Sequence, residues 1–243
     1  MSDDTKIYFA DLESTGLLHH LIEQGDKAKL HNFCAMSVDG KNMWTLHTDT
    51  DSERKTLQRF LDRDIILVMH NGIQYDKYAL KHFGYDVDKV HFVDTLALSW
   101  YLDLYRAKHG LESYGEESGV PKPVIDDWEK LTQADYDIRV QEDVKIQEYT
   151  YRKLKGMFEE LYGKMSDYEF CTHTVVRYLN FKMQQLAEQQ NSKFRVDVEH
   201  AKSVIEKLEK ESNRLLDAYQ SGCVDLKELK TRMSNIKKEK NNE

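Results

Sequence analysis

Two acidic side chains close the first apolar segment of the sequence. In residues 6–13, Asp11 and Glu13 are separated by one residue, so on a β-strand both would project from the same face. They come at the carboxyl end of the segment, where open α/β sheets usually form their ligand sites. Two carboxylates on one face repel each other unless a cation lies between them. The pair is a candidate metal site, although an isolated Asp-x-Glu more often simply faces solvent.

A third acid follows the buried apolar run 65–71. Asn71 and Gly72 are expected to form the turn from this strand into a helix, with Asp76 in its first helical turn. There the carboxylate would complement the helix dipole, or it would point back over the sheet toward the acids of the first strand. The second alternative would add a ligand to the candidate metal site.

A fourth acid, Asp143, lies on a long helical pattern. Arg139 comes one turn earlier, and Tyr136 nearly two turns earlier, on a similar face. Taken alone, Asp143 is an ordinary solvated acid on a charged helix. It becomes a candidate ligand only if the fold brings this helix to the acids of the first strand.

The elements that must position these acids alternate between strands and helices. Strands are predicted over 6–13, 29–38, 42–48, 65–71 and 89–96, and helices over 55–63, 75–84, 97–105 and 133–161. Asp39-Gly40 between the second and third strands indicates a hairpin. Residues 106–132 hold both prolines and are expected to be a long loop with at most a turn or two of helix. This order predicts an α/β domain with a mixed sheet flanked by helices.

The remainder of the chain has a different character. Residues 167–219 are almost all helix formers, interrupted at 191–197, and the polar end from Cys223 onward is expected to be frayed. We therefore divide the chain into a first domain, 1–162, and a mainly helical C-terminal extension, 163–243.

Composition limits the class of protein. The formal net charge of −8 argues against a broad electrostatic grip on nucleic acid, but a carboxylate metal site needs negative charge. No apolar run approaches the roughly 20 residues that cross a bilayer, and the N-terminus is acidic where a leader would be basic. We therefore expect a cytoplasmic location, in the host cytoplasm if the chain is viral, and no membrane partner. Cys34, Cys171 and Cys223 are too scattered for disulfides or zinc and are expected to be buried free thiols.

Together these motifs resemble the DEDD family of 3′→5′ exonucleases. They are most similar to the proofreading domains of phage-type (bacteriophage) family A, pol I-like, DNA polymerases. The resemblance covers about residues 6–160 and is carried, besides Asp-x-Glu, by the strings HNGIQYDKYAL (70–80), VDTLALSWYL (93–102) and HGLESYGEESG (109–119).

This resemblance implies a ribonuclease H-like fold with a DNA 3′ end as substrate. Two Mg²⁺ or Mn²⁺ ions would be held by the four acids Asp11, Glu13, Asp76 and Asp143. Such a pair of ions would support in-line hydrolysis of the terminal phosphodiester, releasing a nucleoside 5′-monophosphate.

The same resemblance assigns residues to the substrate strand. Leu17 would wedge against the terminal base, Tyr75 would pack on the scissile nucleotide, and Thr15 and Asn71 would line the path of the strand. For Leu17 and Tyr75 the alternative is plain core packing. Asp94 would support the site without binding metal.

One position departs from the family pattern. The third motif there reads Tyr-x-x-x-Asp or His-x-x-x-x-Asp, whereas Arg139 and Ile138 stand at these places before Asp143. An arginine cannot act as a general base, because its pKa exceeds about 12. Arg139 would instead contact the scissile phosphate or stabilise transition-state charge, with Tyr136 as an alternative replacement for the missing tyrosine.

The C-terminal extension also resembles a polymerase, in the segment that joins the exonuclease to the polymerase domain. Gln190-Asn191 and a short strand at 194–197 carry this looser similarity. This similarity leads us to expect that the chain is the exonuclease half of a split polymerase and acts in DNA replication beside a separate polymerase chain. The alternative is that the extension only covers the exonuclease core. The alternatives are an RNA-processing or repair 3′→5′ exonuclease, or a catalytically weak nuclease-fold scaffold for a polymerase partner.

Overall fold

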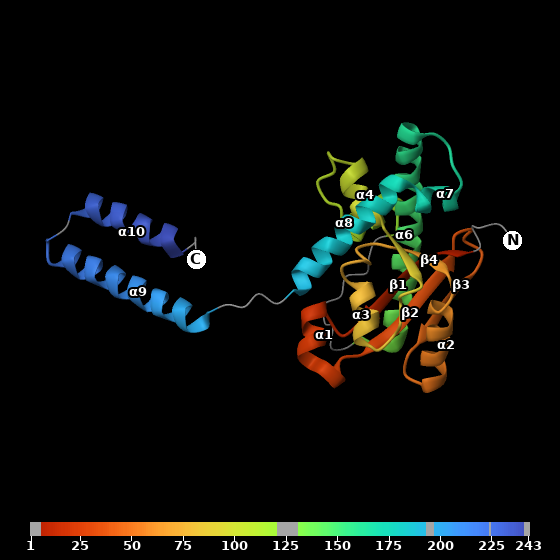
Figure 1. The fold of residues 1–243 in the computed structure, drawn as a ribbon, viewed down its shortest axis with the longest axis horizontal. Helices are drawn as coiled ribbons and strands as arrows, with labels where there is room; N and C mark the ends of the chain where they lie inside the picture. The colour runs from red at the N-terminus through yellow and green to blue at the C-terminus, as the bar shows by residue number, and fades with distance from the viewer. Residues whose placement is uncertain (1–5, 121–130, 193–196, 224, 241–243) are drawn as a thin grey trace. The chain divides into compact units, whose positions relative to one another are not determined.

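The computed structural model describes residues 6–120, 131–192, 197–223 and 225–240 (Figure 1). The chain forms two compact units, Met1–Asn191 and Ser192–Glu243. The sequence places a division at residue 162, but the helices that follow it pack within the first unit, where Phe170 and Val176 join the main core.

The first unit is built on a five-stranded sheet with the order β3-β2-β1-β4-β5. Its strands are β1 (Ile7–Ser14), β2 (Leu30–Ser37), β3 (Met43–His47), β4 (Ile65–Met69) and β5 (Val90–Asp94). β1, β4 and β5 are parallel, whereas β2 pairs antiparallel with both β1 and β3. This mixed sheet, flanked by helices and followed by a mostly helical C-terminal part, confirms the predicted α/β class and is consistent with a ribonuclease H-like fold.

The helices of this unit follow the predicted order with two refinements. They are α1 (Leu18–Gln24), α2 (Asp51–Leu61), α3 (Asp76–His82), α4 (Thr95–Leu102), α5 (Leu111–Ser118), α6 (Gln133–Tyr162), α7 (Asp167–Thr172) and α8 (Thr174–Asn191). The segment after β1, expected to be a loop, contains α1 because fully buried Leu21 anchors one side of it to the core. α5 supplies the two helical turns allowed within 106–132, of which 121–130 lie outside the described residues.

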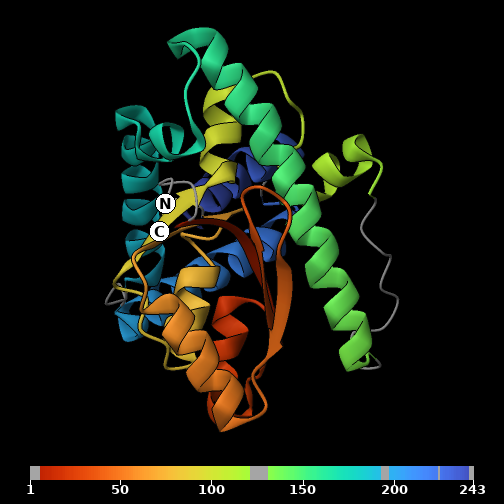
Figure 2. The same ribbon diagram turned by 90° about the vertical axis from the view of Figure 1, so that its right-hand side faces the viewer.

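The sheet separates two layers of core side chains. Ile7 and Phe9 of β1 face a cluster that includes Val144 of α6, whereas Ala10 and Leu12 face the cluster under α2 and α3. Figure 2 shows α6 running along one side of the sheet and α2 on the other. Because side chains of a strand alternate between its faces, every second residue of β1 is directed toward α6.

The second unit contains α9 (Val198–Gln220) and α10 (Leu226–Lys240), where the sequence predicts a frayed end. Within this unit Leu229 and Ile236 of α10 pack against Leu208 and Leu215 of α9. Residues 194–196 of the predicted short strand lie outside the described part of the chain.

Two predictions from composition can be compared with the structure. Cys34 and Cys171 are buried free thiols as predicted, but Cys223, which follows the end of α9, is exposed. Among the described helices, none combines the length and the apolar character needed to cross a membrane.

Candidate active site

The first two acids lie where β1 extends beyond its parallel neighbour. The pairing of β1 with β4 runs from Ile7 to Phe9, and Asp11 and Glu13 follow at the carboxyl end. They share the face of Ile7 and Phe9, because side chains at every second position of a strand project together. This face is covered by α6, so both carboxylates point toward that helix.

The helix α6 brings the fourth acid to this pair. One carboxylate oxygen each from Asp11, Glu13 and Asp143 lie within 4.8 Å of one another, and Asp143 is only 3% exposed. Four residues further along the same helix face, the Gln147 amide donates a hydrogen bond to the Val68 carbonyl of β4. α6 is thus fixed against the sheet, and Asp143 is not the solvated acid that its local sequence suggests.

Asp76 approaches the cluster from α3 without belonging to this tight group of oxygens. It is the first residue of α3 and is 3% exposed. The pKa of its carboxyl is raised to about 8, chiefly by burial and in addition by the nearby charges of Asp94, Glu13 and Asp143. Its Oδ1 is buried and has no hydrogen-bond partner among the described residues. An orphaned carboxylate oxygen beside other acids is what a bound cation would satisfy.

Arg139 is the positive charge closest to these acids in the described contacts. Its Nε donates to Glu13 Oε1 at 2.6 Å, and the two side chains are 16% and 12% exposed. The sequence predicts a phosphate contact for this arginine. In the structure it binds a carboxylate of the candidate metal site and partly neutralises it.

The turn between β4 and α3 is held by Asp94 at the end of β5. Asn71 adopts a left-handed conformation with φ of 63°, which asparagine tolerates better than most residues, and a side chain at Gly72 would collide with the end of β4. The Asp94 carboxylate accepts from the backbone N–H groups of Asn71 (3.0 Å), Ile73 (3.1 Å) and Leu96 (3.0 Å). Burial raises the pKa of Asp94 to about 6, against the effect of these hydrogen bonds. Asp94 therefore supports the turn that leads into α3, as its place in the sequence suggests.

The residues expected to contact substrate differ in their surroundings. Leu17, which precedes α1, is 60% exposed, so plain core packing is excluded for it. Tyr75 packs partly against the core and donates from its hydroxyl to the Gly16 carbonyl at 2.5 Å, while burial raises its pKa to about 12. Thr15 Oγ1 accepts from the backbone N–H of Lys29 at 3.1 Å. Tyr75 thus joins α3 to the loop after β1, beside the exposed leucine.

Tyr136 is enclosed by aromatic packing. It is 9% exposed and stacks on His31, with ring centroids 3.9 Å apart and an interplanar angle of 8°. Burial raises the pKa of its hydroxyl, and the charge of Glu13 raises it further, although Arg139 lowers it. The hydroxyl therefore keeps its proton near neutral pH, which disfavours Tyr136 as a general base.

The sequence motifs do not single out Asp137, which anchors the start of α6. Its carboxylate accepts from Asn32 Nδ2 at 2.8 Å and Gln133 Nε2 at 3.1 Å, and it lies 2.9 Å from His47 Nε2. Burial alone would raise the pKa of Asp137, but the hydrogen bonds from Asn32 and His47 outweigh it and lower the pKa. Asn32 pairs with Glu13 across β1 and β2, so this network fixes α6 directly beside the acids. In the sequence Asp137 is one charge among many on a polar helix.

The arrangement fits a hard divalent cation. Three clustered carboxylates, a fourth buried one nearby and a single arginine leave an excess of negative charge in a mostly buried place. Carboxylate oxygens are the ligands that Mg²⁺ and Mn²⁺ prefer, whereas no thiol or imidazole belongs to the cluster among the described residues.

Comparison with known proteins finds no matching family model and no matching curated protein. Among solved structures, NrnC of Brucella melitensis with bound Mg²⁺ is 18% identical over 80% of this chain and 93% of that chain, with a TM-score of 0.51. A structure described as the apo form of a nuclease is 14% identical over 80% of this chain and 91% of that chain, with a TM-score of 0.53. At such low identity the likeness concerns the fold alone: the chain shares its α/β architecture with these nucleases.

Proposed function

We propose that this protein is a metal-dependent nuclease that hydrolyses the terminal phosphodiester at a nucleic-acid 3′ end. The observation that carries the proposal is the meeting of Asp11, Glu13 and Asp143, from two separate elements, within 4.8 Å at the carboxyl end of the sheet. Phosphoryl chemistry requires little covalent participation by protein and depends on positioned cations. The shared fold supports the proposal, and so does the Mg²⁺ in the NrnC structure.

In this proposal the four acids hold the cations and the surrounding residues hold the strand. Two Mg²⁺ or Mn²⁺ ions, when bound, would supply an activated water and neutralise the leaving oxygen. The acids Asp11, Glu13 and Asp143 would bind them directly, and Asp76 would add its buried oxygen to the ligand set. Arg139 orients Glu13 and would place a permanent positive charge beside the reacting phosphate.

The 3′ terminal nucleotide would lie over the loop after β1. Leu17 offers an exposed apolar contact for the base, and Tyr75 is held in place by its bond to Gly16. Thr15 and Asn71 flank this position from the two loops. Asp94 acts through the backbone of the turn and is a positioning residue.

The substrate class and biological role follow from the sequence motifs. We propose single-stranded DNA 3′ ends as substrate and proofreading as the role, in association with a separate family A polymerase chain. The support is the resemblance of residues 6–160 to proofreading domains. Metal chemistry at the phosphate does not distinguish DNA from RNA, so the comparison of the two belongs to the test.

The decisive experiment measures the degradation of a 3′-labelled and a 5′-labelled strand with Mg²⁺ or Mn²⁺. Glu13→Gln is compared with Glu160→Gln, a matched change at an exposed acid of α6. We expect loss of activity of at least about 10²-fold in the first and none in the second. Equal activity of wild type and Glu13→Gln would overturn the nuclease proposal.

The same assay tests the finer parts. A 3′-mismatched primer-template degraded faster than a matched one supports proofreading, whereas faster cleavage of a matched RNA supports RNA processing. Metal binding without any hydrolysis would favour a scaffold role over catalysis. Native mass measurement with the candidate polymerase tests the partner, and a chain that stays monomeric in its presence contradicts that part.

A further inference from the structure

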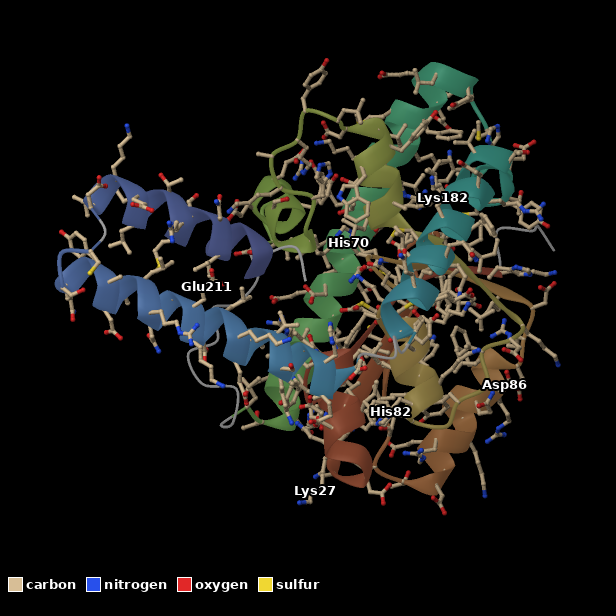
Figure 3. All side chains as sticks on the ribbon, turned by 60° about the vertical axis from the view of Figure 1, so that its left-hand side comes forward. Lys27, His70, His82, Asp86, Lys182 and Glu211 are labelled. Atoms are coloured by element: carbon tan, nitrogen blue, oxygen red, sulfur yellow. The ribbon has the colours of Figure 1, made fainter. Side chains whose placement is uncertain are left out.

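A cavity lies away from the acidic cluster, at the edge of the sheet. It measures about 560 Å³ and is bordered by β5, the last strand of the sheet, and by α8. None of the three clustered carboxylates lines it. Cavities of roughly 300–1,000 Å³ are the usual size of small-molecule sites. Figure 3 shows α8 with many side chains around it and labels Lys182 on this helix.

One face of α8 is directed into this cavity. Arg177, Asn180, Phe181 and Gln184 all line it, at the i, i+3, i+4 and i+7 positions of a single helical stripe. Asn180 also fixes the helix to the strand, because its Nδ2 donates to the Phe92 carbonyl at 2.9 Å and its Oδ1 accepts from the Asp94 N–H at 3.1 Å. The position of the stripe relative to β5 is therefore determined by hydrogen bonds.

The lining combines aromatic rings with positive charge. Phe181 is 59% exposed, and Phe92 lies across from α8 on the strand. Arg177 and Lys77 contribute positive charges, with Lys77 Nζ 5.8 Å from the centre of the Phe92 ring. Asp64 is the acid in the lining, and Lys6 Nζ at 3.3 Å and His91 Nε2 at 3.5 Å already face it. The charge balance of the cavity is positive although the chain as a whole carries −8.

We propose that this cavity binds a nucleoside phosphate unit. The base would pack on Phe181 and Phe92, and the phosphate would contact Arg177 and Lys77. Stacking on an aromatic ring accepts any base, and cations beside it follow the phosphate; this combination is typical of sites for single nucleotides and single strands. An acidic peptide would use the two cations but would leave the aromatic rings without a matching group.

The cavity is connected with the proposed active site through shared elements. Lys77 directly follows Asp76 on α3, and Asn180 holds the backbone of Asp94. The choice of a nucleotide as ligand rests on the proposed nuclease function, whereas the cavity and its charges do not. The nucleotide unit has two sources: a free mononucleotide, which the hydrolysis would release, or a nucleotide within the bound strand.

The first measurement is binding of AMP to the full chain, by calorimetry or equilibrium dialysis, with EDTA present so that no hydrolysis occurs. Arg177→Ala and Phe181→Ala are compared with Lys182→Ala and Tyr178→Ala, neighbouring residues of α8 that do not line the cavity. Tyr178 is 57% exposed, which matches Phe181 closely. We expect each lining variant to weaken AMP binding by about tenfold and each control to leave it unchanged.

The second measurement separates the two sources. The KM of single strands of increasing length is measured for the same four variants with Mg²⁺. If the cavity holds part of the strand, the lining variants raise the KM of long strands by about tenfold and leave the shortest cleavable strand unaffected. If it holds a free nucleotide, AMP binding weakens and the length dependence of KM does not change.

Several outcomes would overturn the proposal. One is that AMP binding and KM are both unchanged in the two lining variants. Another is that the control variants weaken AMP binding as much as the lining variants do, which would indicate a diffuse surface effect. Binding of a poly-glutamate peptide that competes with AMP and is insensitive to Phe181→Ala would contradict the role of the aromatic rings. AMP binding is measured without metal and does not depend on catalysis. A protein that binds AMP but shows no nuclease activity would therefore refute the nuclease proposal and leave the proposal for the cavity intact.

Discussion

Replacing Asp143 by asparagine should stabilise the metal-free protein while abolishing hydrolysis. Carboxylate oxygens of Asp11, Glu13 and Asp143 lie within 4.8 Å of one another. At that separation and an effective dielectric constant of about 20, each pair of full charges repels by about 3.5 kcal/mol. Asparagine has nearly the same shape and removes two of these pairs.

Protonation limits how much of this repulsion can be recovered. A carboxyl with an ordinary pKa of about 3.9 can take up a proton at pH 7 for about 4 kcal/mol, so the repulsion cannot exceed that value. The Arg139–Glu13 ion pair reduces it further. We therefore expect Asp143→Asn to raise the free energy of unfolding by about 1–3 kcal/mol without metal. For a chain of this size that raises Tm by about 3–10 °C.

The assay is thermal unfolding with EDTA and with saturating Mg²⁺, for wild type, Asp143→Asn and Glu160→Gln. In wild type Mg²⁺ should raise Tm, because a ligand that binds only the folded state stabilises it. In Asp143→Asn this rise should shrink strongly, and in the exposed control it should persist. A lower metal-free Tm in Asp143→Asn, or an unchanged response to Mg²⁺, would refute the reasoning that these acids form a repulsive metal site.

Three further predictions follow from the same site. The pKa of Asp76 is raised to about 8, so the folded metal-free protein holds a proton that the unfolded chain releases near pH 4, and its stability should fall as pH rises from about 4 to 8. Since a metal ion must displace this proton, Mg²⁺ affinity measured by calorimetry should rise about tenfold per pH unit up to about 8. A Mg²⁺ affinity that does not change with pH would contradict this prediction. Arg139→Gln should tighten Mg²⁺ binding several-fold, because Glu13 loses a competing cation, and should lower kcat by about 10²–10³-fold. An unchanged kcat would mean that the arginine contributes to stability only. Asp94→Ala should leave buried N–H groups without acceptors, among them that of Ile73, and should therefore lower the free energy of unfolding by about 2–5 kcal/mol, measured by urea titration. A change of less than about 0.5 kcal/mol would contradict the anchoring role of Asp94.

The sequence predicted the strands, the class of fold and the acids that the structure brings together. Its success with Asp11 and Glu13 has a local cause, because alternation along a strand places both on one face. Asp143 could be related to them only through motif resemblance, since nothing in its own helix distinguishes it from a solvated acid. α1 was missed although Leu18, Leu21 and Ile22 have helical spacing, because the segment is short and only Leu21 is fully buried. α10 was missed because its packing against α9 depends on a contact distant in sequence.

The network around Asp137 illustrates what local patterns leave out. Its partners Asn32 and His47 are about a hundred residues away along the chain, so only tertiary structure reveals that the carboxylate joins α6 to β2 and β3. The same holds for Arg139, whose partner Glu13 lies on another element. Sequence motifs supplied the residue types, and the interactions that set their electrostatic state are long-range.

Arg139 stands where the exonuclease motif that this sequence resembles has a tyrosine or a histidine, and its ion pair with Glu13 gives this difference an electrostatic consequence. A cluster of buried carboxylates destabilises a metal-free protein, and a permanent cation among them reduces that cost. The same cation must give up part of its hold on Glu13 before a metal ion can use that carboxylate fully. Arg139 should therefore lower the metal affinity and raise the stability of the metal-free protein. Half-maximal activity should accordingly require more Mg²⁺ in wild type than in Arg139→Gln, whereas the Tm in EDTA should be lower in Arg139→Gln than in wild type.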